Sequence, residues 1–179
     1  MAGRTIRDFD VHELFAAMDS QREERGLSWP GVAREIWSMS HELNATRPND
    51  HPISPSTLTG MPRRGVTSCQ HALCMLAWLG KAPEVFLDGD GPTRSDARLP
   101  ACGPDRRLRW SLKRLYGGLD DQRRRNEMTW KQLAGELGCT SNQLTGLRTA
   151  RYATGIVLAM RITQWLDRPA ADFIRAAKW

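Results

Sequence analysis

The chain repeats itself, and no other feature of its 179 residues constrains the fold as strongly. Residues 14–29 read LFAAMDSQREERGLSW and residues 115–130 read LYGGLDDQRRRNEMTW, so Leu, Asp, Gln, Arg and Trp recur at a constant offset of 101. Farther along, residues 56–61 (STLTGM) match residues 142–147 (NQLTGL) at an offset of 86. Self-similarity on this scale predicts two structural units of one fold.

The change of offset means that the first copy holds 15 more residues than the second, inserted between Ile36 and Ser54. Beyond this insertion the match resumes at an offset of 87, where Trp78 corresponds to Trp165. The stretch between the copies is rich in Gly, Pro and small polar residues, which is typical of a linker. We therefore expect a first domain over residues 1–87, a linker over residues 88–105 and a second domain over residues 106–179.

Each copy has the periodicity of helices, and neither shows a convincing strand pattern. Apolar residues at positions 11, 14, 15 and 18, and at the counterparts 112, 115, 116 and 119, follow the spacing of an amphipathic helix. Fourth helices are expected over about residues 68–80 and 155–166, each followed by a proline and a short fifth helix. The predicted fold is all-α, with two tandem domains of about five helices, and the insertion lies between the second and third helices of the first domain.

In the second copy, two short predicted helices flank a tight turn at Gly138, a residue that suits a helix C-terminus because glycine adopts a positive φ at little cost. Over residues 141–147, short polar side chains stand between the apolar positions Leu144 and Leu147. A face of this kind can enter the major groove of DNA, where Asn and Gln pair with adenine and Thr contacts the thymine methyl group.

Residues 136–151 (ELGCTSNQLTGLRTAR) resemble the helix-turn-helix core of the XRE, or lambda-repressor-like, family. Residues 159–173 (AMRITQWLDRPAADF) resemble the fourth and fifth helices of that family, and residues 54–61 and 76–87 repeat both resemblances in the first copy. Together the resemblance covers roughly residues 11–87 and 112–176. It implies a bacterial transcriptional regulator in which the third helix of each domain enters the major groove.

The resemblance implies double-stranded DNA as the partner and places the contacts on and around the third helices. The expected contact residues are Lys131, Thr140, Ser141, Asn142, Gln143, Thr145, Arg148 and Arg151 in the second copy, and Ser54, Ser56, Thr57, Thr59, Arg63 and Arg64 in the first. The arginines that follow each helix would hold phosphates. Trp29 and Trp130 stand where the family often has a Gln that contacts the DNA backbone, so that contact is not carried over.

The charge is distributed unevenly between the copies. The whole chain has a net charge of +6, but residues 101–179 hold 15 Lys and Arg against 7 Asp and Glu, a net of +8. Residues 1–100 hold 11 against 13, a net of −2. Because phosphate contacts contribute most of the affinity for DNA, the second copy should supply most of the binding.

No arrangement of residues recommends catalysis, so we expect neither an enzyme nor a small-molecule substrate. Cys69, His71 and Cys74 share one predicted helix and lack the paired Cys spacing of zinc sites, so neither a metal nor another cofactor is expected. The chain opens without a secretory signal and has no apolar run of the roughly 20 residues that a membrane span needs. We expect a cytoplasmic, nucleoid-associated protein.

The insertion leaves a second interpretation open. Residues 37–43 can extend the second helix by about two turns before residues 47–52 loop back. Such an arm could brace the groove, clash with DNA or bind another protein. The alternative function is therefore a protein-interaction module, antitoxin-like or a sensor partner, that binds a protein partner or a second copy of the chain. The sequence also leaves open whether the linker is a flexible tether or the copies pack rigidly.

Overall fold

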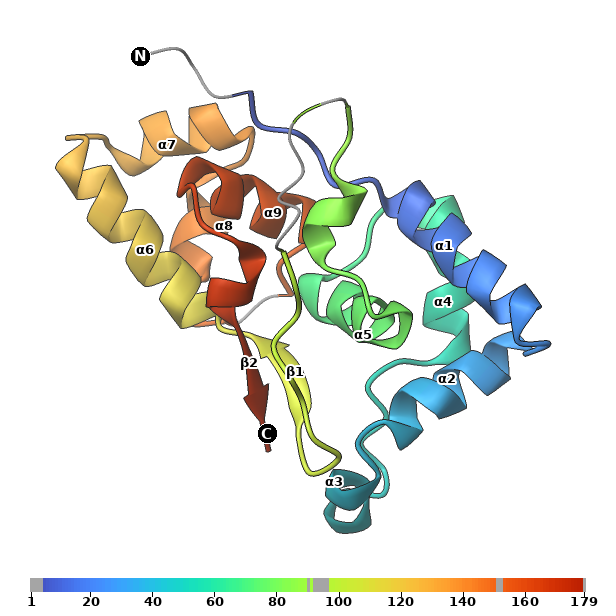
Figure 1. Ribbon diagram of the computed structural model, residues 1–179. Coiled ribbons are helices and arrows are strands. Elements are labelled where there is room, and N and C mark those ends of the chain that lie inside the picture. Colours follow the sequence, from blue (N-terminus) through green and yellow to red (C-terminus); the bar gives the residue numbers. More distant parts are fainter. Residues whose placement is uncertain (1–4, 90, 92–96, 151–152, 179) are drawn as a thin grey trace.

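The computed structural model describes residues 5–89, 91, 97–150 and 153–178, and it is mostly helical (Figure 1). The helices are α1 (Val11–Glu24), α2 (Trp29–Ser38), α3 (His41–Thr46), α4 (Pro55–Arg64), α5 (Cys69–Leu79), α6 (Leu112–Arg125), α7 (Trp130–Leu137), α8 (Ser141–Gly146) and α9 (Ile156–Trp165). Short 3-10 helices, η1 (Pro83–Phe86) and η2 (Ala170–Phe173), follow α5 and α9. We call residues 5–87 the first half and residues 106–178 the second half.

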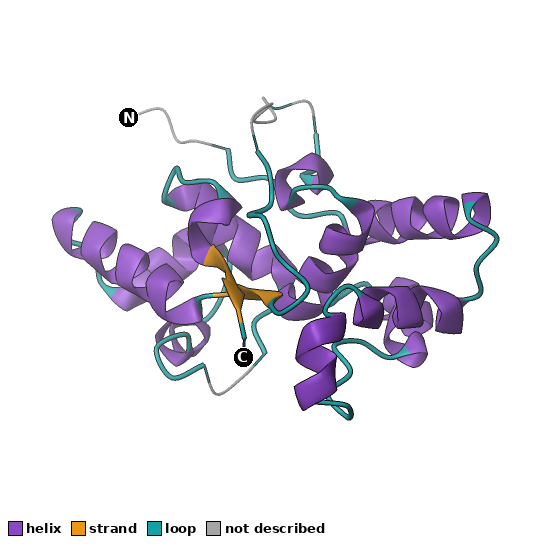
Figure 2. Ribbon diagram, turned by 60° about the horizontal axis from the view of Figure 1, so that its bottom comes forward, coloured by secondary structure: helices purple, strands orange, loops and turns teal. Residues whose placement is uncertain are grey.

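The expectation of a purely helical chain is wrong at two short segments. Strand β1 (Arg107–Trp110) pairs antiparallel with β2 (Ile174–Ala177), with Arg107 opposite Ala177 and Trp110 opposite Ile174. Figure 2 shows the two strands near the centre of the molecule, with helices on both sides. The inward-facing residues of β1, Leu108 and Trp110, are buried. Four residues are too few to show an alternating pattern, and the partner strand lies far away in the sequence.

Equivalent positions of the repeat make equivalent side-chain contacts. In each half, one Trp stacks on an aromatic ring of the first helix, and another donates its indole N–H to a glutamate of the second helix. The stacked pairs are Phe15–Trp29 and Tyr116–Trp130, with ring centroids 5.2 and 5.4 Å apart, and the hydrogen-bonded pairs are Trp78–Glu35 and Trp165–Glu136, at 2.8 and 2.7 Å. Each of these four tryptophans therefore packs within its own half.

The backbone repeats its contacts as well. The Asp10 N–H donates to the Phe86 carbonyl at 2.8 Å, and the Ser111 N–H donates to the Phe173 carbonyl at 2.7 Å. Phe9 forms an isolated antiparallel bridge with Leu87, which is the first half's short counterpart of the β1–β2 pair. The segment that precedes the first helix therefore closes onto the segment that follows the 3-10 helix in both halves.

The two halves pack on each other through their fourth helices, α5 and α9. At the start of these helices the Cys69 N–H donates to the Thr154 carbonyl at 2.7 Å, and the Ile156 N–H donates to the Thr67 carbonyl at 3.0 Å. Thr67 and Thr154 are equivalent in the repeat, as are Cys69 and Ile156. Such reciprocal contacts define an isologous interface, so an approximate two-fold axis relates the halves at this point.

Further contacts join the halves into one hydrophobic core. The buried carboxylate of Glu84 accepts a hydrogen bond from the Ala170 N–H at 2.7 Å. The Arg7 N–H donates to the Gln164 side chain at 2.9 Å, and the Gln164 amide donates back to the Arg7 carbonyl at 2.8 Å. Rigid packing, and not a loose tether, therefore sets how the halves are oriented.

The insertion does not lengthen the second helix as expected. Helix α2 ends at Ser38, and a separate short helix, α3, begins at His41. The backbone N–H groups of Glu42 and Leu43 both donate to the Pro104 carbonyl at 3.2 Å. The arm thus folds against the segment that leads into β1 instead of projecting from the molecule.

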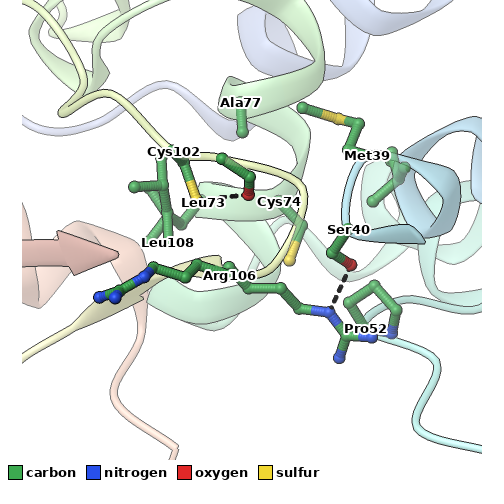
Figure 3. Close-up of a pocket in the computed structure, with 12 residues that line it drawn as sticks. Met39, Ser40, Pro52, Leu73, Cys74, Ala77, Cys102, Arg106 and Leu108 are labelled. Carbon is green, nitrogen blue, oxygen red and sulfur yellow. Dashed lines mark hydrogen bonds between the residues drawn. The ribbon is translucent and has the colours of Figure 1, made fainter. Parts of the chain in front are cut away.

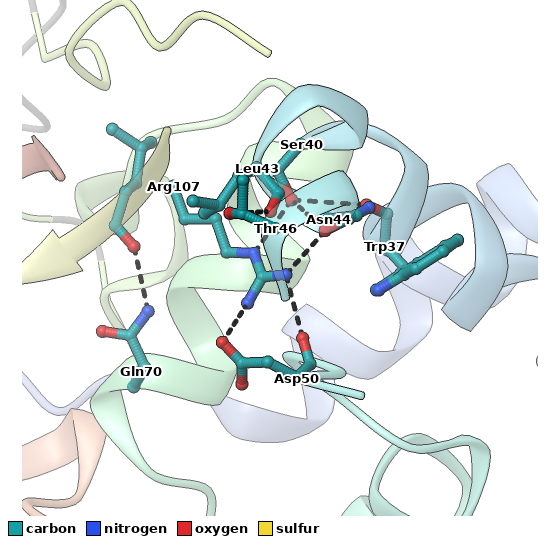
Figure 4. Close-up of polar contacts among 9 residues, drawn as sticks. Trp37, Ser40, Leu43, Asn44, Thr46, Asp50, Gln70 and Arg107 are labelled. Atoms are coloured by element: carbon teal, nitrogen blue, oxygen red, sulfur yellow. Dashed lines mark hydrogen bonds and ion pairs between the residues drawn. The ribbon is translucent and has the colours of Figure 1, made fainter. Parts of the chain in front are cut away.

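Arg107 of β1 is the main anchor of the arm (Figure 4). Its guanidinium donates to Ser40 Oγ at 2.8 Å, to Asn44 Oδ1 at 2.7 Å, to Asp50 Oδ2 at 3.0 Å and to the Asp50 carbonyl at 2.9 Å. Ser40 and Asn44 are both buried. Because buried polar groups need partners, removing this one cation leaves several of them unsatisfied.

We predict that Arg107→Ala lowers the free energy of unfolding by about 2–3 kcal/mol, since it removes charge-assisted hydrogen bonds to buried groups. The measurement is urea denaturation followed by circular dichroism. Arg106→Ala is the matched control, because Arg106 is exposed and pairs with its neighbour Asp105. It should change the stability by less than about 0.5 kcal/mol. Equal losses in the two variants would show that Arg107 does not anchor the arm.

Candidate nucleic-acid interface

Helices α7 and α8 of the second half form the pair that the sequence predicted, joined by a tight turn. Gly138 ends α7 with a φ of 62°, in the left-handed region that favours glycine. Thr129 caps α7 and Thr140 caps α8, each in a reciprocal capping box. Leu133 and Leu144 pack between the helices and are fully buried. Local sequence signals therefore specify this unit at both helix starts, at the turn and in the core.

Arg161 of α9 forms hydrogen bonds at the turn between α7 and α8. Its guanidinium donates to the Leu137 carbonyl at 3.0 Å and to the Gly138 carbonyl at 3.3 Å, at the C-terminus of α7 where a positive charge is favourable. The same guanidinium forms an ion pair with Asp8 of the first half at 2.6 Å. One cation thus ties the helix-turn-helix unit to the other half of the molecule.

The outer face of α8 is open to solvent. Asn142 and Thr145 are exposed, Ser141 and Gly146 are half-buried, and the cap residue Thr140 is exposed. Over the part of the chain that the structure describes, the Asn142 side chain has no hydrogen-bond partner. Its amide is therefore available to both a donor and an acceptor on a ligand.

Two expected phosphate contacts flank this face. Lys131 near the start of α7 and Arg148 just after α8 are both exposed. Neither forms an ion pair within the described ranges of the chain. The expected contact at Arg151 falls outside the described residues.

The Gln143 side chain makes a contact that the sequence interpretation did not include. Its side-chain oxygen accepts hydrogen bonds from the Thr140 N–H at 2.9 Å and from the Thr140 hydroxyl at 3.1 Å. A bidentate pair with adenine needs that oxygen, so Gln143 cannot make such a pair while the capping box is intact. The Thr-x-x-Gln spacing is itself the capping-box signature and could have revealed this role.

In the first half, the counterpart of α8 is α4, which begins at a serine cap where α8 has a threonine. Ser54 accepts the Thr57 N–H at 3.2 Å, and the side chains of Ser56 and Thr59 are exposed while Thr57 is half-buried. Unlike α8, this helix continues for another turn, through Pro62. The expected polar face is therefore accessible in both halves.

The two arginines that end α4 differ from each other. Arg63 is exposed, whereas Arg64 folds back and donates to the Thr57 carbonyl at 2.9 Å. Its guanidinium also covers Gly60, where even a Cβ atom would collide with it. At the equivalent position of α8, Gly146 has open space around it. Arg64 therefore occupies surface on α4 whose equivalent on α8 is not covered by any of the residues that the structure describes.

Cys69 and Cys74 of α5 pack in the hydrophobic core. Burial raises the pKa of Cys69 to about 12 and that of Cys74 to about 11, so both remain neutral thiols at physiological pH. Among the described residues, no group of three or more His, Cys, Asp or Glu could hold a metal ion. In the same part of the chain, no helix combines the length and apolarity needed to cross a bilayer.

A small pocket lies between the end of α2, α5 and the segment before β1 (Figure 3). Its volume is about 70 Å³, and its lining is mainly apolar, with Leu73, Cys74 and Leu108 on one side and Met39 on another. Pockets for drug-sized ligands usually measure roughly 300–1,000 Å³, so this one is far smaller than a typical substrate site.

Comparison with known proteins found no matching family model, no similar curated protein and no similar solved structure.

The Asp8–Arg161 pair should make stability depend on acidity. The hydrogen bond from Arg161 lowers the pKa of Asp8 below its ordinary value of 3.8. A carboxyl group with a lowered folded-state pKa stabilises the protein above its unfolded pKa, and this contribution is lost as the pH falls through the folded pKa. We predict that the free energy of unfolding of Asp8→Asn falls less steeply below about pH 4 than that of the parent.

The measurement is urea denaturation at several pH values between about 2.5 and 6. Asp121→Asn is the control, because Asp121 is exposed and its side chain has no ion pair among the described residues. This control should keep the parent's pH profile. If Asp8→Asn also keeps the parent's profile, the ion pair does not contribute to the contact between the halves.

Proposed function

We propose that this protein is a sequence-specific double-stranded DNA-binding transcriptional regulator that inserts α8, and its counterpart α4, into the major groove. The observation that carries this proposal is the solvent-exposed face of α8, on a helix that a capped turn holds in place, with an Asn142 side chain that has no hydrogen-bond partner among the described residues. Sites on rigid elements fix side chains well enough to discriminate between bases.

The residues of α8 have separate roles in this proposal. Asn142 pairs bidentately with an adenine through N6 and N7. The Thr145 hydroxyl donates to the Ser141 carbonyl at 3.1 Å, which leaves its methyl group to contact a thymine methyl group. Gln143 holds the helix start, and its amide nitrogen remains a donor for a phosphate or a base acceptor.

Lys131 and Arg148 hold the phosphates on either side of the groove. Cations in this position fix the protein's register on the duplex and make binding depend steeply on salt concentration. The exposed Arg63 has the same role beside α4. Because the second half carries the greater positive charge, it supplies most of the affinity.

The alternative, a protein-interaction module that uses the inserted arm, has less support. The arm's buried polar groups are bound to Arg107 and Pro104 of the same chain. In Figure 1, α3 lies at the lower end of the molecule, apart from both α4 and α8. We therefore assign the arm to stabilising the fold and not to contacting DNA.

We predict that Asn142→Ala abolishes the preference for adenine at one position of the site. One bidentate pair contributes about 1–3 kcal/mol of discrimination, so the preferred sequence should lose roughly 5- to 150-fold in affinity relative to its substituted form. The measurement is fluorescence anisotropy with duplexes chosen by selection from random DNA.

Asn49→Ala is the matched control, because Asn49 is an exposed residue of the distant arm. It should leave both affinity and sequence preference unchanged. A selected sequence that is the same for Asn142→Ala and for the parent would show that α8 does not read bases.

Gly146 provides a test that separates stability from binding. Gly146 is one helical turn from Asn142 on α8, and no atom of the described residues lies within 4 Å of the place where its Cβ would be. A glycine in a helix costs about 0.5–1 kcal/mol relative to alanine, so no internal contact accounts for its presence. Close approach of the duplex accounts for it in our proposal.

We predict that Gly146→Ala raises the free energy of unfolding by up to about 1 kcal/mol and weakens DNA binding. Gly117→Ala is the matched control, because Gly117 of α6 is also surrounded by open space. The control should be stabilised similarly and bind DNA normally. Equal DNA affinity of the two variants would contradict the close approach of DNA to α8.

A further inference from the structure

We infer that one chain reads two half-sites that are inverted relative to each other, at one fixed spacing, with α8 on one half-site and α4 on the other. This inference rests on the proposed function and adds the arrangement of the DNA target. It follows from the approximate two-fold relation between the halves. A tandem repeat or a flexible linker would not by itself produce this relation.

The evidence for the two-fold relation is the reciprocity of the contacts between α5 and α9. The hydrogen bond from Cys69 N–H to the Thr154 carbonyl has a counterpart from Ile156 N–H to the Thr67 carbonyl. The antiparallel bridge at the centre of these bonds joins Ser68 to its own counterpart. If translation alone related the halves, equivalent surfaces of the two halves would not contact each other.

The same interface is rigid enough to fix the spacing. Ala72 of α5 and its counterpart Ala159 of α9 are fully buried, as are Leu73 and its counterpart Met160. The Asp8–Arg161 ion pair and the Glu84–Ala170 hydrogen bond add contacts at other points between the halves. The distance between α4 and α8 is therefore set by packed structure and not by the length of residues 88–105.

The orientation of the DNA target follows from this symmetry. Helices α4 and α8 are equivalent in the repeat, and each lies shortly before the fourth helix of its half. Figure 1 shows them on opposite sides of the α5–α9 pair. A two-fold axis between two recognition helices matches the local two-fold axis of B-DNA, which relates inverted half-sites about one helical turn, or ~34 Å, apart.

The two half-sites are not the same sequence. Ser56 and Thr57 stand on α4 where α8 has Asn142 and Gln143, and Arg64 folds over Gly60 of α4. The target is therefore inverted in direction but unequal in its base pairs, with the stronger half-site under the basic second half.

The test uses the full chain and synthetic duplexes built from the site that selection from random DNA returns. One set holds the two half-sites in the inverted arrangement and the other in the direct arrangement, at the same spacing. A third set keeps the inversion and adds 5 base pairs, about half a helical turn, between the half-sites. We expect the inverted duplex at the selected spacing to bind at least about tenfold more tightly than the other two.

A variant separates the contribution of each helix. Ser56→Ala combined with Thr59→Ala removes exposed polar groups of α4, so it should lower the affinity for the two-site duplex towards that of the α8 half-site alone. Its affinity for a duplex with only the α8 half-site should stay unchanged, which also shows that it is folded.

The outcomes distinguish the inference from the function on which it rests. Equal affinity for inverted and direct duplexes, or tolerance of the added half turn, overturns the inference and leaves a DNA-binding protein. Binding that needs only the α8 half-site likewise overturns the inference and leaves a DNA-binding protein. Absence of any affinity for duplex DNA overturns both.

Discussion

The contact between the N-terminal ends of α5 and α9 is the interaction on which the rest of the structure depends. Two short hydrogen bonds between equivalent backbone positions align the halves, and buried residues of both helices hold them there. Because a backbone pairing of this kind fixes both distance and direction, it also fixes where α4 and α8 lie. The repeat in the sequence thus becomes a symmetric arrangement of two exposed helices instead of two independently moving units.

The positive charge of the second half stabilises the fold and, in our proposal, also binds the phosphates of DNA. Arg107 holds the inserted arm, and Arg161 holds the helix-turn-helix turn and Asp8. Arg123 pairs with Asp120 at the end of α6. These arginines are paired within the chain. Fewer cations are therefore available to bind phosphates than the net charge suggests. Exposed residues such as Lys131 and Arg148 remain for that purpose.

Much of the local structure was predictable, because helix caps, glycine turns and apolar spacing act over a few residues. The helix-turn-helix unit of α7 and α8 and the fourth helices, α5 and α9, follow from such signals. What was missed depends on partners far away in the sequence: the pairing of β1 with β2, and the docking of the arm on Arg107. The capping role of Gln143 could have been predicted as well, because the Thr-x-x-Gln spacing is a local signal, but the sequence analysis considered only a contact with DNA.

In our proposal, a single chain carries both recognition helices in the arrangement that one DNA site requires. Native mass spectrometry at saturation measures the number of chains bound to one duplex that carries the selected site. We expect one 20.2 kDa chain per duplex. A complex that forms only with two chains per duplex would contradict it.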